Sequence, residues 1–149
     1  MRHLCLALCS VLLVTTAATS GEHATWSGRI KAVFHAQCAG CHGADSPEYP
    51  AWKKEKEKFV ADSKGPRMDT YAHLVYFTAW PDTGALMRRL DDGKGSGDGK
   101  AGNMYEHLGG SDEERQKNLA LFKAWVGNWT LKRWKDITKE EMDGIKVPY

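Results

Sequence analysis

The stretch Cys38-Ala39-Gly40-Cys41-His42 decides how the rest of the chain is interpreted. Two cysteines that are separated by two residues and followed at once by histidine form the C-x-x-C-H pattern of c-type haem attachment. The two thiols add across the haem vinyl groups as thioethers, and the adjacent imidazole then lies under the iron as the proximal ligand. The stretch therefore predicts one covalently bound haem c, held by Cys38, Cys41 and His42.

A disulfide or half of a zinc site is the alternative for such a pair of cysteines. A thioredoxin-like disulfide needs a βαβ context, which the sequence lacks. A zinc site needs further ligands at metal-binding spacing, whereas His35, His73 and His107 are scattered along the chain. Haem attachment is the interpretation that uses every cysteine outside the first twenty residues.

The first twenty of the 149 residues have the pattern of a secretory signal. Arg2 gives a basic start, residues 4–14 form an apolar run, and residues 18–20 are small. The run is too short to span a bilayer, and no second run is long enough. We expect residues 1–20 to be a cleaved signal peptide and residues 21–149 to form one monohaem domain in the periplasm, with no membrane span.

Charge and cysteine content narrow the class of protein further. Cleavage would remove Cys5 and Cys9, and it would leave Cys38 and Cys41 alone. It would also remove one basic residue, Arg2, so that the net charge falls from +2 to +1. Such a balance shows no bias towards polyanions, and we expect no nucleic-acid partner.

The hydrophobic pattern predicts an all-α fold, because apolar residues recur at helical spacing and no segment alternates as a strand does. The expected helices cover residues 26–37, 51–63, 69–80, 84–90 and 112–126. The glycine-rich loop, residues 93–102, lacks the spacing of a phosphate loop and the ligands of an EF-hand. We expect it to be a flexible connection.

Several residues are candidates for helix caps. Thr25 or Ser27 can cap the first helix, and Asp82 or Thr83 can cap the helix that contains Met87. Ser111-Asp-Glu-Glu114 and Thr138-Lys-Glu-Glu141 have the spacing of capping boxes.

The sixth ligand of the iron is the least determined part of the site. The candidates are Met68, Met87, Met104, Met142, His23, His35, His73 and His107. Met87 lies between leucines on a predicted helix, where methionine is usually core filler. Met104 follows the glycine-rich loop, where the backbone can approach a macrocycle closely. Met104 is therefore favoured, with Met87 and His107 as rivals.

The order of these elements resembles the class I cytochrome c family: a helix, C-x-x-C-H, intermediate helices, a loop methionine and a capped last helix. The resemblance is residue-specific at Cys38, Cys41, His42, Met104 and Ser111. It implies an all-α, class I cytochrome c-like fold wrapped around one covalent haem, here with an extended C-terminal tail. It also implies axial ligation by His42 and Met104.

Two features depart from the usual pattern of that family. Its ligand methionine is usually followed by proline, whereas this chain has Tyr105. Gly65-Pro66 resembles the family's Gly-Pro, whose proline carbonyl accepts a hydrogen bond from the proximal imidazole. It comes late after His42, so Pro47 and Pro50 are rivals.

The resemblance gives two further expectations. The family's first and last helices cross at a close contact, for which Phe34 and Trp125 are the candidates. Trp80, next to Pro81, is a candidate neighbour of a haem propionate through its indole N–H.

The function that the resemblance implies is outer-sphere transfer of single electrons, without catalysis of a reaction. The partners would be redox proteins that dock transiently onto a monomer. Two alternatives remain. One is a peroxidase-like enzyme with His73 or His107 over an open iron. The other is a gas or redox sensor in which Tyr105 loosens the loop and Met104 is a labile ligand.

Overall fold

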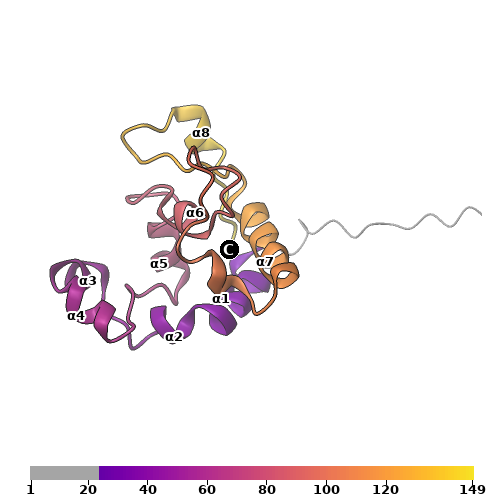
Figure 1. The fold of residues 1–149 in the computed structure, drawn as a ribbon. Helices are drawn as coiled ribbons and strands as arrows, with labels where there is room; N and C mark the ends of the chain where they lie inside the picture. Colours follow the sequence, from indigo (N-terminus) through magenta and orange to yellow (C-terminus); the bar gives the residue numbers. More distant parts are fainter. Residues whose placement is uncertain (1–23) are drawn as a thin grey trace, which may run out of the picture.

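The computed structural model describes residues 24–149, so the predicted signal peptide lies outside the described residues. The elements in order are η1 (Trp26–Ile30), α1 (Lys31–Gln37), α2 (Ala39–His42), α3 (Tyr49–Lys54), α4 (Lys56–Ala61), α5 (Tyr71–Tyr76), α6 (Ala85–Leu90), η2 (Tyr105–Leu108), α7 (Asp112–Val126) and α8 (Lys139–Asp143) (Figure 1). In this part of the chain the β pairing is one isolated bridge, between Gly127 and Ile145. The all-α prediction is confirmed.

The first predicted helix is present but kinked. Thr25 caps it, because its side-chain oxygen accepts a hydrogen bond from the backbone N–H of Gly28 at 3.0 Å. Gly28 itself has a non-helical ψ of −112°, and the chain passes there from the π-helical turn η1 into α1. The sequence pattern could not reveal this kink, since the apolar spacing continues through it.

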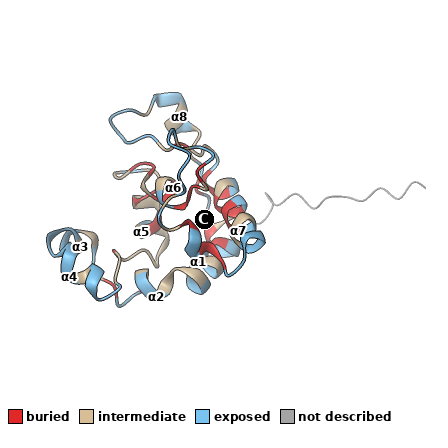
Figure 2. Cartoon of the chain, in the orientation of Figure 1, coloured by how far each residue is buried: buried red, intermediate tan, exposed pale blue. Residues whose placement is uncertain are grey.

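The predicted helix over residues 51–63 is two short helices, α3 and α4. They meet at Glu55, whose φ of −120° and ψ of 38° break the helix. Trp52 and Phe59 are half-buried while most other side chains of the pair are exposed, as expected for a polar helix. Figure 2 shows this pair in mostly exposed colours at one side of the molecule.

The start of α6 corrects the prediction that Asp82 or Thr83 caps it. The N-cap is Gly84, with φ 72° and ψ 1°, and no side chain caps the helix. Thr83 is fully buried, and its hydroxyl donates to the carbonyl of Ala79 instead. α5 is shorter than expected, and Thr70 caps it by accepting from the N–H of His73 at 3.3 Å.

The last long helix, α7, begins as predicted at Ser111, whose hydroxyl accepts from the N–H of Glu114 at 3.2 Å. The predicted capping box is only half present, because the carboxylate of Glu114 accepts from the N–H of Gly110 at 2.8 Å. The second predicted box, between Thr138 and Glu141, is complete.

The core lies where η1, α1, α5, α6 and α7 meet, and Figure 2 shows buried segments gathered there. Phe34 and Trp125 are both buried, as expected. The ring centroid of Phe34 lies 6.3 Å from that of Trp26, and the ring centroid of Trp125 lies 6.5 Å from that of Phe122. The first helix meets α7 chiefly through η1 rather than through the turn that carries Phe34.

The C-terminal tail does not extend away from the molecule. After α8 it returns along α7, and the N–H of Lys146 donates to the carbonyl of Val126 at 2.8 Å. Its last residues then lie beside the first helix. The carbonyl of Pro148 accepts from the N–H of Trp26 at 3.0 Å and from the indole N–H of Trp125 at 2.8 Å.

The first backbone N–H groups of a helix have no acceptor within the helix. The tail provides such acceptors for the start of the first helix. Among residues 24–149, no helix is both long enough and apolar enough to cross a membrane.

Candidate haem site

The C-x-x-C-H stretch forms the end of α1 and the single turn α2. The N–H of Cys38 still donates to the carbonyl of Phe34 at 2.8 Å, and the N–H of His42 donates to the carbonyl of Cys38 at 2.9 Å. Both thiols are free and lie one helical turn apart. Burial, and secondarily the neighbouring Cys41, raise the pKa of the Cys38 thiol to about 12.

The imidazole of His42 is held by the segment that returns from α4. Its Nδ1 lies 2.7 Å from the carbonyl oxygen of Pro66. A carbonyl can only accept, so Nδ1 carries the hydrogen and donates, which leaves the lone pair on Nε2. Burial lowers the pKa of His42; the hydrogen bond to Pro66 opposes this, and nearby His107 adds to it. A neutral imidazole with a free Nε2 is the form that binds a metal ion.

The proximal segment, residues 64–68, is fixed to the C-x-x-C-H turn by its backbone. The N–H of Gly65 donates to the carbonyl of Cys41 at 2.8 Å, and the N–H of Met68 donates to that of His42 at 2.9 Å. A Cβ on Gly65 would clash with the His42 ring, lying 2.5 Å from Nδ1 and 2.8 Å from Nε2. Only glycine lets the backbone pass this close to the imidazole.

The rivals for Gly65-Pro66 are excluded as hydrogen-bond partners of His42. The carbonyl of Pro47 accepts from the N–H of Arg67 at 2.9 Å. Pro50 lies at the start of α3 and is exposed. The late position of Gly65-Pro66 arises because α3 and α4 form an excursion that leaves the C-x-x-C-H turn and returns to it.

Lys64 closes this excursion, and sequence reasoning missed it. Its ammonium contacts the Asp45 carboxylate at 2.5 Å and the carbonyl of Gly40 at 3.3 Å. The hydrogen bond from Lys64 holds the pKa of Asp45 below its ordinary value. The indole N–H of Trp52 donates to the Lys64 carbonyl at 3.1 Å, which attaches α3 to the same point. A lone lysine at the end of a charged helix carries no sequence signal for this role.

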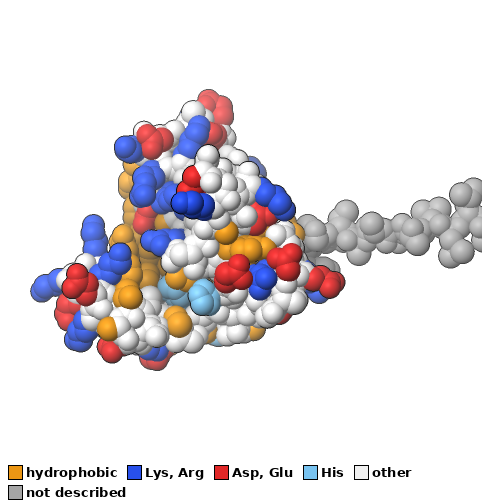
Figure 3. All heavy atoms as spheres, in the orientation of Figure 1, with side chains coloured by type: hydrophobic (Ala, Val, Ile, Leu, Met, Phe, Trp, Pro, Cys, Tyr) orange, Lys and Arg blue, Asp and Glu red, His pale blue; other side chains and the backbone are white. Residues whose placement is uncertain are grey.

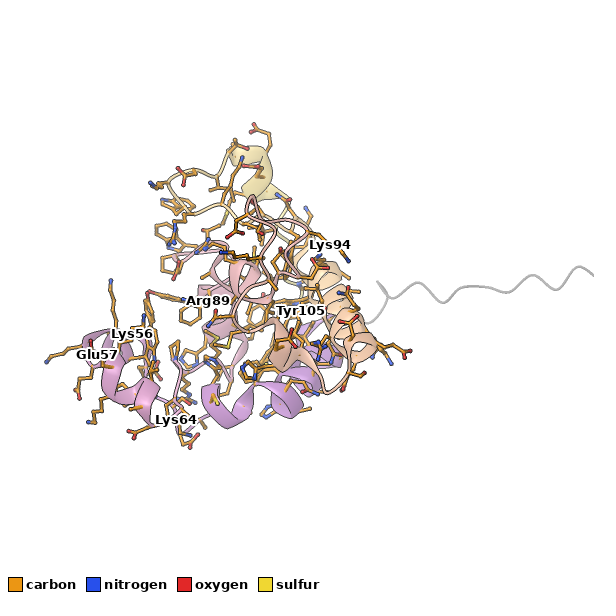
Figure 4. All side chains as sticks on the ribbon, viewed as in Figure 1. Lys56, Glu57, Lys64, Arg89, Lys94 and Tyr105 are labelled. Carbon is orange, nitrogen blue, oxygen red and sulfur yellow. The ribbon has the colours of Figure 1, made fainter. Side chains whose placement is uncertain are left out.

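Met104 lies on the ligand loop, residues 102–108, which contains η2. Its N–H donates to the carbonyl of Arg89 at 2.9 Å, so the loop is attached to the end of α6. The Met104 side chain is half-buried and packs against the core. Figure 4 labels Arg89, whose backbone accepts this hydrogen bond, and Tyr105, the residue that follows Met104.

Tyr105, which stands where the family usually has proline, anchors the loop. It is buried, its hydroxyl accepts from Gln116 Nε2 at 2.6 Å, and the hydroxyl lies 3.3 Å from an Asp112 oxygen. The guanidinium of Arg115 lies 5.9 Å from its ring. The expectation that Tyr105 loosens the loop finds no support in these contacts.

The other candidate ligands have different surroundings. Met87 is fully buried in the core, as core filler would be. His73 has both ring nitrogens engaged, Nδ1 with Thr70 at 2.9 Å and Nε2 with Glu48 at 3.1 Å. His107 lies in η2 on the same loop as Met104 and is exposed.

Apolar side chains are exposed on the face shown in Figure 3, where an orange band runs beside histidine side chains. Trp80 and Trp134 are each about half exposed and pack together, with ring centroids 4.3 Å apart. The expected contact between Trp80 and a propionate stays a prediction. Residues 24–149 contain no group of three or more His, Cys, Asp or Glu side chains that could hold a metal ion.

These residues fit a covalently attached haem. Two cysteine side chains lie on one turn, the His42 imidazole is oriented by Pro66 with Nε2 left for a metal ion, and the absence of a Cβ at Gly65 leaves room for that ring. A half-buried thioether lies on a separate loop. This is the set of groups that a c-type site with two axial ligands requires.

Comparisons with known proteins agree with this geometry. The family model of PccH cytochrome c matches residues 25–149. The solved structure of the monoheme cytochrome PccH from Geobacter sulfurreducens is similar, with a TM-score of 0.79 and 65% sequence identity. The match covers 84% of this chain and 98% of that one. No curated protein sequence matches the chain.

Proposed function

The chain belongs to the PccH cytochrome c family and as such carries one covalently bound haem c as an electron carrier, and from that premise we propose how its residues perform the task. We propose that Cys38 and Cys41 form the thioether bonds, and that His42 and Met104 are the axial ligands. The observation that carries this proposal is the hydrogen bond from His42 Nδ1 to Pro66, which leaves only Nε2 for the iron.

The haem supplies an iron that alternates between Fe(III) and Fe(II), and the chain supplies the surroundings. Pro66 fixes the tautomer and the orientation of His42, and it makes the imidazole a better electron donor. A Met104 thioether on the other side is a soft ligand that favours Fe(II), which raises the reduction potential relative to a second imidazole. A site closed on both sides transfers electrons without binding a substrate.

Two observations favour electron transfer over the enzyme and sensor alternatives. His73 has its ring nitrogens engaged with Thr70 and Glu48, so it is a poor candidate for a distal catalytic histidine. Tyr105 is buried and hydrogen-bonded, which supports a firmly held rather than a labile Met104.

The rival that keeps some support is His107. It is exposed and lies three residues after Met104 on the same loop, so its imidazole is the alternative second ligand. Ligation by two imidazoles would keep the function and lower the potential.

Three alanine variants of the purified holoprotein separate these possibilities. Met104→Ala is expected to remove the thioether-to-iron charge-transfer absorption of the ferric protein and to lower the potential. Met87→Ala is expected to keep that absorption and to lose about 2–5 kcal/mol of unfolding free energy, since it leaves a cavity in the core. His107→Ala should change neither the charge-transfer absorption nor the reduction potential substantially.

A spectrum that survives in Met104→Ala and changes in His107→Ala would overturn the ligand assignment in favour of two imidazoles. A spectrum that changes only in Met87→Ala would assign the thioether to α6.

We further propose that residues 1–20 are removed on export and that the mature protein acts in the periplasm as a monomer. Its redox partners would dock transiently, with a small contact area. The intact mass of the protein recovered from the periplasm tests the first point. It should equal residues 21–149 plus one haem, and a mass that still includes residues 1–20 would contradict cleavage.

A further inference from the structure

The glycine-rich loop folds around a buried carboxylate. Asp91 is 1% exposed, and one of its oxygens accepts from the N–H groups of Gly93 at 3.0 Å and Gly95 at 3.2 Å. The other oxygen accepts from the indole N–H of Trp129 at 3.0 Å. A buried carboxylate is tolerated only when its oxygens are satisfied, and here neutral donors from two parts of the chain satisfy it.

Both ends of the loop return to Asp91. Gly93 and Gly95, at the entry, bind its side chain, and Gly102, at the exit, donates its N–H to the backbone carbonyl of Asp91 at 2.8 Å. Gly93 has a φ of 90°, and a Cβ there would lie 2.6 Å from the carbonyl oxygen of Gly99. Met104 follows two residues after Gly102, so the same residue determines where the ligand loop begins.

Trp129 connects this arrangement to the C-terminal segment. It follows the end of α7, where Gly127 turns the chain with a φ of 77°. The ammonium of Lys123 lies 5.5 Å from its ring. Through its indole N–H, the segment after α7 is attached to the carboxylate that organises the glycine-rich loop.

We propose that Asp91 is a positioning residue for the axial thioether: by binding Gly93, Gly95, Gly102 and Trp129 together, it holds the ligand loop so that Met104 stays on the iron. The proposal rests on the ligation by Met104 proposed above. Asp91 acts through the loop and not by contact with the haem. The expectation of a flexible connection is thereby replaced by that of a loop organised by one carboxylate.

The test compares five ferric holoproteins: the wild type, Asp91→Asn, Trp129→Phe, the double variant that combines these two changes, and Asp98→Asn. Asparagine keeps the size of the side chain but replaces one acceptor oxygen with a donor, so one set of N–H groups loses its partner. The measurement is the pH at which the thioether-to-iron charge-transfer absorption disappears as another ligand replaces Met104. This pH reports the stability of the ligand bond rather than that of the fold.

We expect Asp91→Asn to favour ligand replacement about tenfold, since one or two hydrogen bonds to a charged group are lost. For a one-proton exchange this lowers the midpoint by about one pH unit. Trp129→Phe removes a single donor and should shift the midpoint in the same direction by less. The double variant should show less than the sum of the two shifts, because both changes break the same contact.

Asp98→Asn is the matched control. Asp98 lies on the same loop and accepts from the N–H of Lys100 at 3.1 Å and from the hydroxyl of Ser96 at 3.0 Å. All of these bonds stay within the loop, so its midpoint should equal that of the wild type.

Three results would overturn the proposal. If Asp91→Asn keeps the wild-type midpoint while amide hydrogen exchange at Gly93 and Gly95 accelerates, the carboxylate orders the loop without positioning Met104. If Asp91→Asn does not accumulate as holoprotein, an unshifted midpoint in folded Trp129→Phe rejects the link. If the wild type lacks the absorption and Met104→Ala has the same spectrum, ligation by Met104 fails and the positioning role fails with it.

Discussion

The two sides of the haem site are held in different ways. On the proximal side, residues 64–68 bind the backbone of the C-x-x-C-H turn directly, and the His42 ring is fixed between Gly65 and Pro66. On the other side, the ligand loop is attached to the end of α6, to α7 and, through Asp91, to Trp129. In Figure 4, Lys64 of the proximal segment lies near the bottom of the view, and Lys94 of the glycine-rich loop lies apart from it on the right, above Tyr105.

This difference teaches that the two proposed axial ligands, His42 and Met104, depend on different ranges of structure. His42 is positioned by contacts that form as soon as one excursion of the chain has closed. Met104 is positioned by side chains and backbone groups that come together only when α6, α7 and the C-terminal segment have packed. Substitutions close to His42 should therefore disturb the proximal side most. The ligand loop should also respond to substitutions far from Met104 in the sequence.

The largest effect that would test this contrast is expected from Gly65→Ala. The added methyl group cannot fit beside the His42 ring, so the imidazole must rotate and lose its bond to Pro66. We expect a loss of about 1–3 kcal/mol of unfolding free energy, as for other overpacked sites. The ferric spectrum should also show a weakened or missing imidazole ligand.

Gly97→Ala is the matched control on the glycine-rich loop. No atom lies within 4 Å of the position that its Cβ would take, so the unfolding free energy should change by about 0.5 kcal/mol or less. If both alanine variants keep the wild-type spectrum and stability, the proximal segment is less rigid than its contacts imply.

The sequence predicted the proximal side better than the ligand loop, for a physical reason. C-x-x-C-H and Gly65-Pro66 are recognisable because each residue has a role that few other residues can fill: thioether formation, metal ligation, close approach and an acceptor carbonyl. Asp91 and Trp129 have no such pattern, because a buried carboxylate and an indole can meet in many ways. Their partnership exists only in the folded chain.

The fold shows the same division. Helix positions followed from apolar spacing, and the caps at Thr25, Ser111 and Thr138 followed from side-chain chemistry. The breaks at Gly28 and Glu55 did not, since the apolar pattern continues through them.

An effect of similar size on stability, but without loss of the imidazole ligand, is expected from Asn118→Leu. The buried amide of Asn118, on α7, donates to the carbonyl of Leu108 at 2.6 Å, at the end of η2. Leucine has a similar size but leaves that carbonyl unpaired, which should cost about 1–3 kcal/mol of unfolding free energy. Chemical denaturation of the holoprotein measures the change.

Asn103→Ala gives the comparison within the ligand loop itself. Asn103 is exposed and accepts from Arg89 at 2.7 Å. Its replacement should cost less than about 1 kcal/mol, because water replaces the lost partner. A larger loss in Asn103→Ala than in Asn118→Leu would mean that the loop is held by its local contacts, contrary to the contrast drawn above.

The smallest effect is a pH dependence of the unfolding free energy that arises from Asp69, the residue that follows the proximal segment. Asp69 is paired with Arg67, with the closest approach at 2.6 Å, and this hydrogen bond holds the pKa of Asp69 below its ordinary value. A carboxylate with a lowered pKa in the folded state stabilises the fold above its ordinary pKa, and the contribution disappears as the pH falls through the folded pKa. The unfolding free energy of the wild type should therefore decrease more between about pH 5 and 2 than that of Asp69→Asn, which cannot ionise there.

Because Arg67 is partly exposed, the difference should be below about 1 kcal/mol. Denaturation curves at a series of pH values measure the difference. Parallel pH profiles for the two proteins would show that the pair adds nothing to the stability of the proximal side, which would then depend on its backbone bonds alone.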